Sequence, residues 1–117
     1  MPVIPVTRAI IQGGIEVITW TNLANGDTGE PVLVLGQAGA VGCLQAEGSF
    51  GGGTLTLQGS NIASGAGAYR NVKDGAGNGL SLTAPDMEDF STAAAYISPA
   101  LAGGSAGSVT VSVVVRW

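Results

Sequence analysis

The sequence predicts an all-β fold, a single-domain β-sandwich or jelly roll of about eight short antiparallel strands with an extended N-terminal arm. The 117 residues include 20 glycines and five prolines, which favour many tight turns. Yet 45% of the residues are hydrophobic, an apolar content that disordered chains lack. We therefore expect short β-branched segments between the turns to be strands that share one core, and the length fits one domain.

The strand with the clearest pattern is expected over residues 108–116 (SVTVSVVVR). Its alternate positions are all valine, which is the period of a strand with one buried face. Residues 54–60 (TLTLQGS) alternate in the same way, and residues 15–21 (IEVITWT) are β-branched and aromatic. Further strands are expected over residues 8–11, 30–35, 40–50, 68–72, 80–83 and 94–101.

Two segments depart from this pattern. Pro2 and Pro5 favour extended structure, so residues 1–14 are assigned to an N-terminal arm and residues 15–117 to the sandwich domain. Residues 85–90 (PDMEDF) are the one segment with local helical character, and the sequence allows either a single helical turn or a loop there.

The charge content argues against several classes of protein. Only 10% of the residues are charged, with four basic residues and a net charge of -4. A nucleic-acid-binding protein needs clustered Lys and Arg, so nucleic acid is not an expected partner. We expect no membrane span, because no apolar run reaches about 20 residues, and the first residues do not resemble a signal peptide. A surface this poor in charge favours cover by other protein subunits over a solitary monomer.

The residues that usually carry catalysis are scarce. The chain has no histidine and one cysteine, Cys43, which we interpret as a small apolar core residue. The acidic residues Asp86, Glu88 and Asp89 are interpreted as a solvated loop. The glycine runs lack the context of a phosphate-binding loop and are interpreted as turns. We therefore predict that the protein is not an enzyme, and we expect no cofactor, metal site or internal disulfide.

Four segments, in this order and spacing, resemble small virion proteins of tailed bacteriophages, specifically head decoration (cement) proteins. They are TWTNLANGDTGEPV (19–32), GGGTLTLQGSN (51–61), KDGAGNGLSLTA (73–84) and AYISPALAGGSAGSVTVSVVVR (95–116). The resemblance implies a jelly-roll or β-sandwich subunit that binds the outer surface of an icosahedral capsid. It further implies contacts with the major capsid protein, which the subunit would stabilise, and assembly as a homotrimer at three-fold sites.

The predicted location is therefore the capsid surface of the virion, after synthesis in the host cytoplasm. The alternative is a binding module on a phage tail or fibre, with a carbohydrate or a protein as its ligand. The residues predicted to contact other subunits are at the chain ends: Pro2, Val3, Ile4, Pro5, Val6 and Trp117. The prolines would let the arm order on a neighbour at low entropic cost, and a terminal aromatic is a common contact residue.

Overall fold

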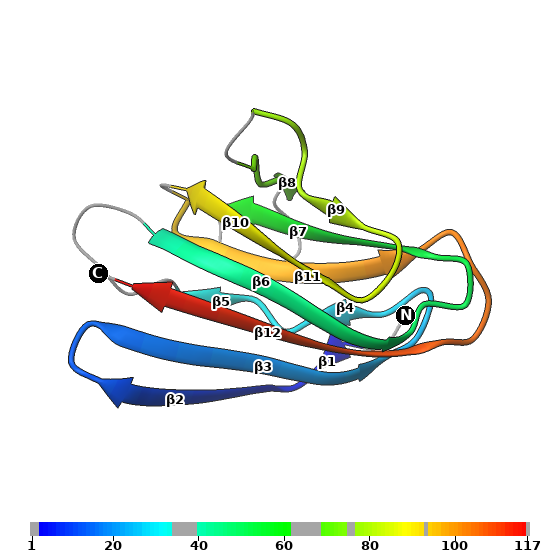
Figure 1. Ribbon diagram of the computed structural model, residues 1–117, viewed down its shortest axis with the longest axis horizontal. Helices are drawn as coiled ribbons and strands as arrows, with labels where there is room; N and C mark the ends of the chain where they lie inside the picture. Colours follow the sequence, from blue (N-terminus) through cyan, green and yellow to red (C-terminus); the bar gives the residue numbers. More distant parts are fainter. Residues whose placement is uncertain (1–2, 34–39, 62–68, 75–76, 93, 117) are drawn as a thin grey trace.

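The computed structural model describes residues 3–33, 40–61, 69–74, 77–92 and 94–116, which form two β-sheets packed as a sandwich (Figure 1). Within these residues there are twelve strands. They are β1 (Val3–Ile4), β2 (Val6–Gln12), β3 (Ile15–Leu23), β4 (Thr28–Gly29), β5 (Val32–Leu33), β6 (Ala40–Ser49), β7 (Thr54–Ser60), β8 (Arg70–Asn71), β9 (Ser81–Leu82), β10 (Asp86–Thr92), β11 (Tyr96–Ala102) and β12 (Ser108–Arg116). The all-β prediction is confirmed.

The five-stranded sheet has the order β10-β6-β12-β3-β2, and all its neighbouring strands are antiparallel. β12 lies at its centre. Val113 pairs with Leu44 on β6 and with Ile18 on β3, and all three side chains are fully buried. Because successive side chains of a strand point to opposite faces, the alternating valines of β12 determine which face of this sheet is buried.

The second sheet has the order β1-β4-β11-β7-β8, with β5 also pairing with β11 and β9 with β7. The long antiparallel pair of β11 and β7 forms its middle, from Tyr96 opposite Ser60 to Ala102 opposite Thr54. The short strands β4 and β5 follow one another along the opposite side of β11, and β1 pairs with β4 in parallel. The predicted antiparallel arrangement therefore has one parallel exception, at the edge where the N-terminal segment joins.

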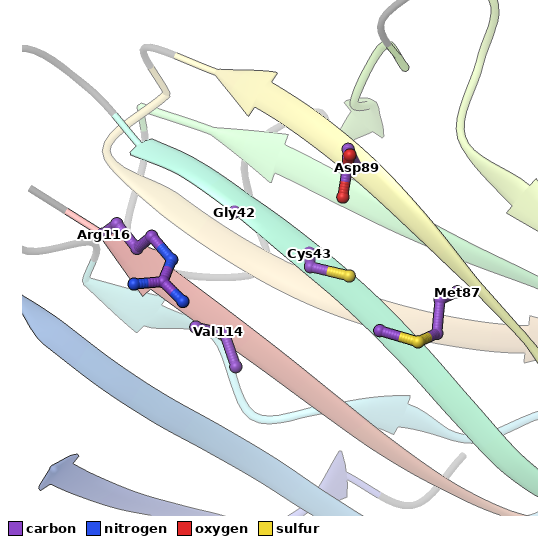
Figure 2. A pocket seen from close by; sticks show the side chains of 6 residues that line it. All are labelled: Gly42, Cys43, Met87, Asp89, Val114 and Arg116. Carbon is purple, nitrogen blue, oxygen red and sulfur yellow. The ribbon is translucent and has the colours of Figure 1, made fainter.

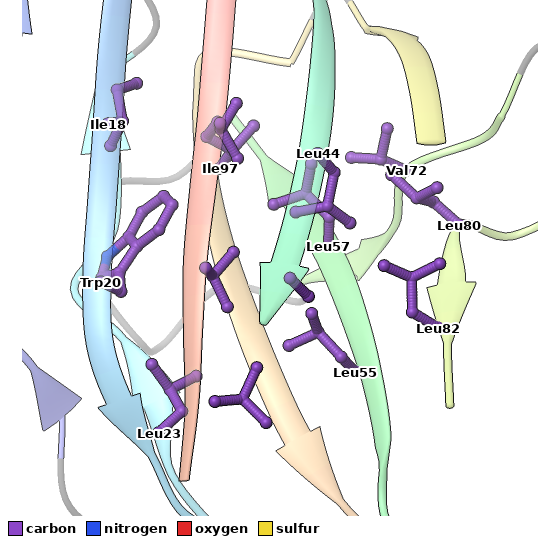
Figure 3. Close-up of a cluster of buried hydrophobic side chains, with 14 of the residues drawn as sticks. Ile18, Trp20, Leu23, Leu44, Leu55, Leu57, Val72, Leu80, Leu82 and Ile97 are labelled. Carbon is purple, nitrogen blue, oxygen red and sulfur yellow. The ribbon is translucent and has the colours of Figure 1, made fainter. Parts of the chain in front are cut away.

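The core lies between the two sheets (Figure 3). Trp20 from the five-stranded sheet is fully buried, and so are Leu57 and Ile97 from the other sheet. The indole Nε1 of Trp20 donates a hydrogen bond to the carbonyl oxygen of Glu30 at 3.0 Å, so its polar atom is satisfied at the edge of the core. Burying a large apolar side chain contributes about 1.5–3 kcal/mol, which makes this core the main source of stability.

The N-terminal segment joins both sheets. Val3 and Ile4 pair with β4 of the seven-stranded sheet, whereas residues 6–12 pair with β3 of the five-stranded sheet. Ile4 and Val6 are half-buried and pack against the core. Residues 3–12 of the predicted arm are therefore extended, as the prolines indicated, and are built into the sandwich of the same chain.

The segment predicted to be a helical turn or a loop is a strand. Asp86–Thr92 forms β10, which pairs along its whole length with β6. Phe90 is 2% exposed and anchors this strand in the core. Tertiary packing of that one aromatic side chain, with the ladder to β6, outweighs the local preference that three acids and a proline suggested. The strand number was also underestimated, because the two-residue strands β1 and β4 carry no periodic signal.

Asn25 connects three loops at one end of the sandwich. Its side-chain nitrogen donates to the carbonyl oxygens of Phe50 and Ala106, both at 2.9 Å, and its side-chain oxygen accepts from the N–H of Gly104 at 3.0 Å. Gly53 lies so close to this amide that any side chain at position 53 would collide with it. The predicted turn at Asn25 thus also links, by hydrogen bonds, the loops that precede β4, β7 and β12.

Candidate protein-binding surfaces

The structure describes four of the six residues predicted to contact other subunits, and Pro2 and Trp117 lie outside the described residues. Val3 is 57% exposed, and Pro5 is exposed between β1 and β2. Ile4 and Val6 contribute to the core of their own chain, as described above. Of these four, Val3 and Pro5 are thus the ones exposed to a partner, and their role in an interface stays a prediction.

The exposed large apolar side chains concentrate on one side of the sandwich. Among the described residues they are Val3 (57% exposed), Ile10 (59%), Ile11 (68%), Leu33 (48%) and Met87 (54%). Four of these five belong to β2, the edge strand of the five-stranded sheet, and to β1 and β5, which lie beyond β11 at the edge of the other sheet. We call this side the amino-terminal edge. Single exposed apolar residues are ordinary, but several of them along one strand edge are typical of a contact surface.

Ile10 and Ile11 were not predicted as contact residues, although the sequence carried a signal. Two adjacent apolar residues in a strand point to opposite sides, so one must leave the core unless both faces are covered. Here β2 is the edge strand of its sheet, and its register with β3 shifts between Ile10 and Gln12. This irregularity leaves both isoleucines largely exposed to solvent.

The backbone of β2 has one open edge. The N–H of Val6 donates to the carboxylate Oε1 of Glu30 at 3.1 Å, so it points away from β3. Since backbone groups alternate in direction along an antiparallel strand, those of Arg8 and Ile10 also point away from β3. No described strand pairs with this side of β2. Such a row of backbone donors and acceptors can pair with a strand of another protein.

The charged side chain of β2, Arg8, is paired within the chain. Arg8 Nε and Nη2 donate to the two carboxylate oxygens of Glu16 at 2.7 and 2.9 Å, and Nη2 also donates to the carbonyl oxygen of Leu33 at 2.9 Å. Glu16 is 3% exposed, and its hydrogen bond is the main cause that raises the pKa of Arg8. The ion pair therefore links β2 and β3 to β5 of the other sheet, and it leaves the amino-terminal edge without a free positive charge.

A shallow hollow of about 370 Å³ lies on the outer face of the five-stranded sheet (Figure 2). Cys43 on β6 lies there between Val114 of β12 and Asp89 of β10 in the register. The prediction that Cys43 belongs to the core is wrong, because Leu44 faces the core and the next residue along a strand faces outward. Partial burial first, and Asp89 second, raise the pKa of the Cys43 thiol. A thiol with a raised pKa is a poor nucleophile at neutral pH.

Other chemistry is sparse in the part of the chain that the structure describes. Its His, Cys, Asp and Glu residues form no group of three or more that could hold a metal ion. The described residues form strands, turns and loops, and they include no helix that is long and apolar enough to cross a membrane. Most of the exposed large apolar side chains of the described residues lie at the amino-terminal edge, which is therefore the candidate surface for protein binding.

Comparison with known proteins finds a similar fold but no similar sequence. No protein-family model matches the sequence, and no curated protein sequence is significantly similar to it. The SPBc2 prophage-derived protein YomS has a similar structure, with a TM-score of 0.55 and 11% identity, over 92% of this chain and all of YomS. The periplasmic lysozyme inhibitor PliG of Aeromonas hydrophila aligns with a TM-score of 0.48 and 13% identity, over 97% of this chain and 96% of its own. At such identities, the first likeness shows that this chain and YomS share a β-sandwich fold.

Proposed function

We propose that this chain is a non-enzymatic structural protein of a bacteriophage virion that decorates the outer capsid surface and stabilises contacts between major capsid subunits. Its partners in this proposal are the major capsid protein and further copies of itself in a homotrimer. The sequence resemblance to decoration proteins supports it, and the β-sandwich fold is compatible with it. The same fold also occurs in a prophage-derived protein, so a phage gene can encode it.

The observation that carries the proposal is the amino-terminal edge. It combines the exposed side chains of Ile10 and Ile11 with an open strand edge and with a neutralised arginine. An interface core is poor in charge and rich in apolar contact, and main-chain pairing adds directional hydrogen bonds. A protein that binds an assembled shell, and not its free subunits, stabilises the shell by mass action.

The proposal is tested by sedimenting the purified chain with empty capsids of the phage that encodes it. We expect saturable binding by the unmodified chain and a rise in the melting temperature of the capsids. The double substitution Ile10→Lys and Ile11→Lys is expected to weaken binding at least about tenfold, since it puts two charges into an apolar contact. Met87→Lys is the matched control, because Met87 is 54% exposed on the opposite edge strand.

Substitution is preferable to deletion of residues 1–7. Ile4 and Val6 pack against the core, so their removal would unfold part of the sandwich and confuse loss of stability with loss of binding. The melting temperature of each variant shows whether it has folded. Equal binding by the double variant and the unmodified chain would contradict a role for the amino-terminal edge, and no binding to capsids by either would contradict decoration itself.

The solution mass gives an independent test of the homotrimer. Light scattering on a size-exclusion column is expected to give three times the mass of the 11.5 kDa chain. A ring of six subunits would instead support a position in the tail. A monomer would contradict a preformed trimer, and trimers would then have to form on the capsid.

A further inference from the structure

The outer face of the seven-stranded sheet contains a hollow of about 350 Å³, and among its lining residues Val3 alone also belongs to the amino-terminal edge. This volume lies near the lower end of the range of small-molecule sites. Its walls include Val3 and Pro31 on one side and Gln58 and Tyr69 on the other, with Thr28 and Ser98 between them. The hollow therefore lies across β1, β4, β11 and β7, on the face that points away from the five-stranded sheet.

The hollow follows from an irregularity in the pairing with β11. Thr28 pairs with Ala100, and Val32 pairs with Ile97. Three residues lie between Thr28 and Val32, whereas only two lie between Ile97 and Ala100. The β4–β5 side therefore carries one extra residue. An extra residue bends a strand and interrupts its ladder. Pro31 lies in the interruption and Pro99 lies opposite it, and neither can donate a backbone hydrogen bond.

Ser98 satisfies the backbone at this interruption. It is 6% exposed, and its Oγ donates to the carbonyl oxygen of Gly29 at 2.7 Å. A serine hydroxyl has one proton and two acceptor lone pairs, so this bond leaves acceptor capacity on Oγ. The register places Ser98 directly opposite Gln58 on β7, and Gln58 Nε2 donates to Asn71 Oδ1 at 3.4 Å. The hydroxyl of Ser98 and the oriented amide of Gln58 are therefore neighbours in the lining of the hollow.

The lining is uncharged. None of the described residues that line the hollow is ionised at neutral pH, and the nearby Glu30 directs its carboxylate to the backbone N–H of Val6. Burial first and Tyr96 second raise the pKa of the Tyr69 phenol, which therefore keeps its proton at neutral pH. The polar groups are hydroxyls and one amide, and the rest of the lining is the aliphatic surface of Val3 and Pro31 with the ring of Tyr69.

We propose that this hollow binds one unit of a neutral saccharide. A pyranose carries hydroxyls around its rim and C–H groups on its faces, which matches a floor of hydroxyl and amide groups beside an aromatic ring and aliphatic side chains. An anionic ligand would find no cation among the described lining residues, and a purely apolar ligand would not use the acceptor capacity that remains on Ser98 Oγ. This inference does not depend on the decoration function.

The test titrates the ¹⁵N-labelled full chain with D-glucose, D-galactose, D-mannose and N-acetyl-D-glucosamine, and with N-acetylneuraminic acid as the anionic comparison. We expect at least one neutral sugar to shift the side-chain amide signals of Gln58 with a dissociation constant on the order of 1 mM, a value usual for weak ligands. Gln58→Ala and Tyr69→Ala are each expected to weaken binding at least about tenfold. Gln45→Ala is the matched control, because Gln45 is exposed on the outer face of the other sheet. This substitution is expected to leave the affinity for the sugar unchanged.

Two results would overturn the inference. One is the absence of saturable shifts at Gln58 with every neutral sugar, and the other is sugar binding that both Gln58→Ala and Tyr69→Ala leave intact. The same variants, tested for sedimentation with capsids, separate this site from the decoration function. If they lose sugar binding and keep capsid binding, the two functions occupy different surfaces.

Discussion

The two edge strands of the five-stranded sheet differ in how they meet solvent. β10 carries Asp86, Glu88 and Asp89, and at Phe90 it is bridged to Asp74 from the hairpin before β9. β2 has one charged side chain, that of Arg8, which is paired with Glu16. It also exposes Ile10 and Ile11 and has no described strand along its open side.

The difference distinguishes an edge that resists pairing from one that permits it. Charged side chains along an edge strand oppose association with another strand, and a covering segment blocks part of the backbone. β10 has both forms of protection. β2 has a local irregularity near Ile11 as its main protection, and the rest of its edge remains accessible. A partner chain would therefore approach the sheet from the β2 side.

The largest effect in this comparison is expected from Glu16→Gln. The variant keeps the shape of the side chain but leaves the guanidinium of Arg8 without its counter-charge next to a carboxamide. Breaking a buried ion pair costs up to about 3–5 kcal/mol, and because Arg8 is partly exposed we expect a loss of about 2 kcal/mol. Urea unfolding followed by tryptophan fluorescence measures it, since Trp20 is fully buried in the folded chain.

Asp86→Asn is the control on the other edge strand, where the same chemical change affects an exposed side chain. We expect it to alter the unfolding free energy by less than about 0.5 kcal/mol. If the two variants were equally stable, the ion pair between Arg8 and Glu16 would contribute no more than an exposed surface pair does.

The protection of β10 is tested by removing its charges together. The triple variant Asp86→Asn, Glu88→Gln and Asp89→Asn changes the formal net charge from -4 to -1, because three acids are lost. We expect the variant to associate with itself through β10. The protein concentration at which half of the chains are associated is expected to be about tenfold lower for the variant than for the unmodified chain. Light scattering over a concentration series measures this. An unchanged mass at all concentrations would show that the contact between Asp74 and Phe90 protects the edge without help from charge.

The strands with strict alternation could be predicted from the sequence. Residues 108–116 and 54–60 form β12 and β7 with the predicted bounds, because period-2 burial is a local property of the chain. The strand β10 was missed because its signal is not local. Four of its first five positions are exposed or half-buried, and only Phe90 enters the core, which depends on the neighbouring strand β6.

The surfaces were harder to predict than the strands. The pairing of Arg8 with Glu16 depends on the register of the β2–β3 hairpin, which shifts by one residue after Ile10. The hollow beside Ser98 depends on an extra residue in a segment whose partner lies about 70 positions away in the sequence. Neither relation follows from composition or spacing. Residues at the chain ends were predicted to contact other subunits because of their prolines and their terminal aromatic residue. The exposed isoleucines Ile10 and Ile11 lie a few positions after the predicted N-terminal residues.

The smallest expected effect concerns Cys43, which lies next to the protected edge (Figure 2). Partial burial is the main cause that raises the pKa of its thiol, and the hydrogen bond and negative charge of Asp89 add to it. Asp89→Asn removes the added part, so the pKa falls and the thiolate fraction at a given alkaline pH rises. Alkylation by iodoacetamide between pH 7 and 10 measures the shift, and Asp86→Asn serves as the control. An unchanged profile would show that Asp89 does not act on this thiol, and the contrast between the two edges would then concern association alone.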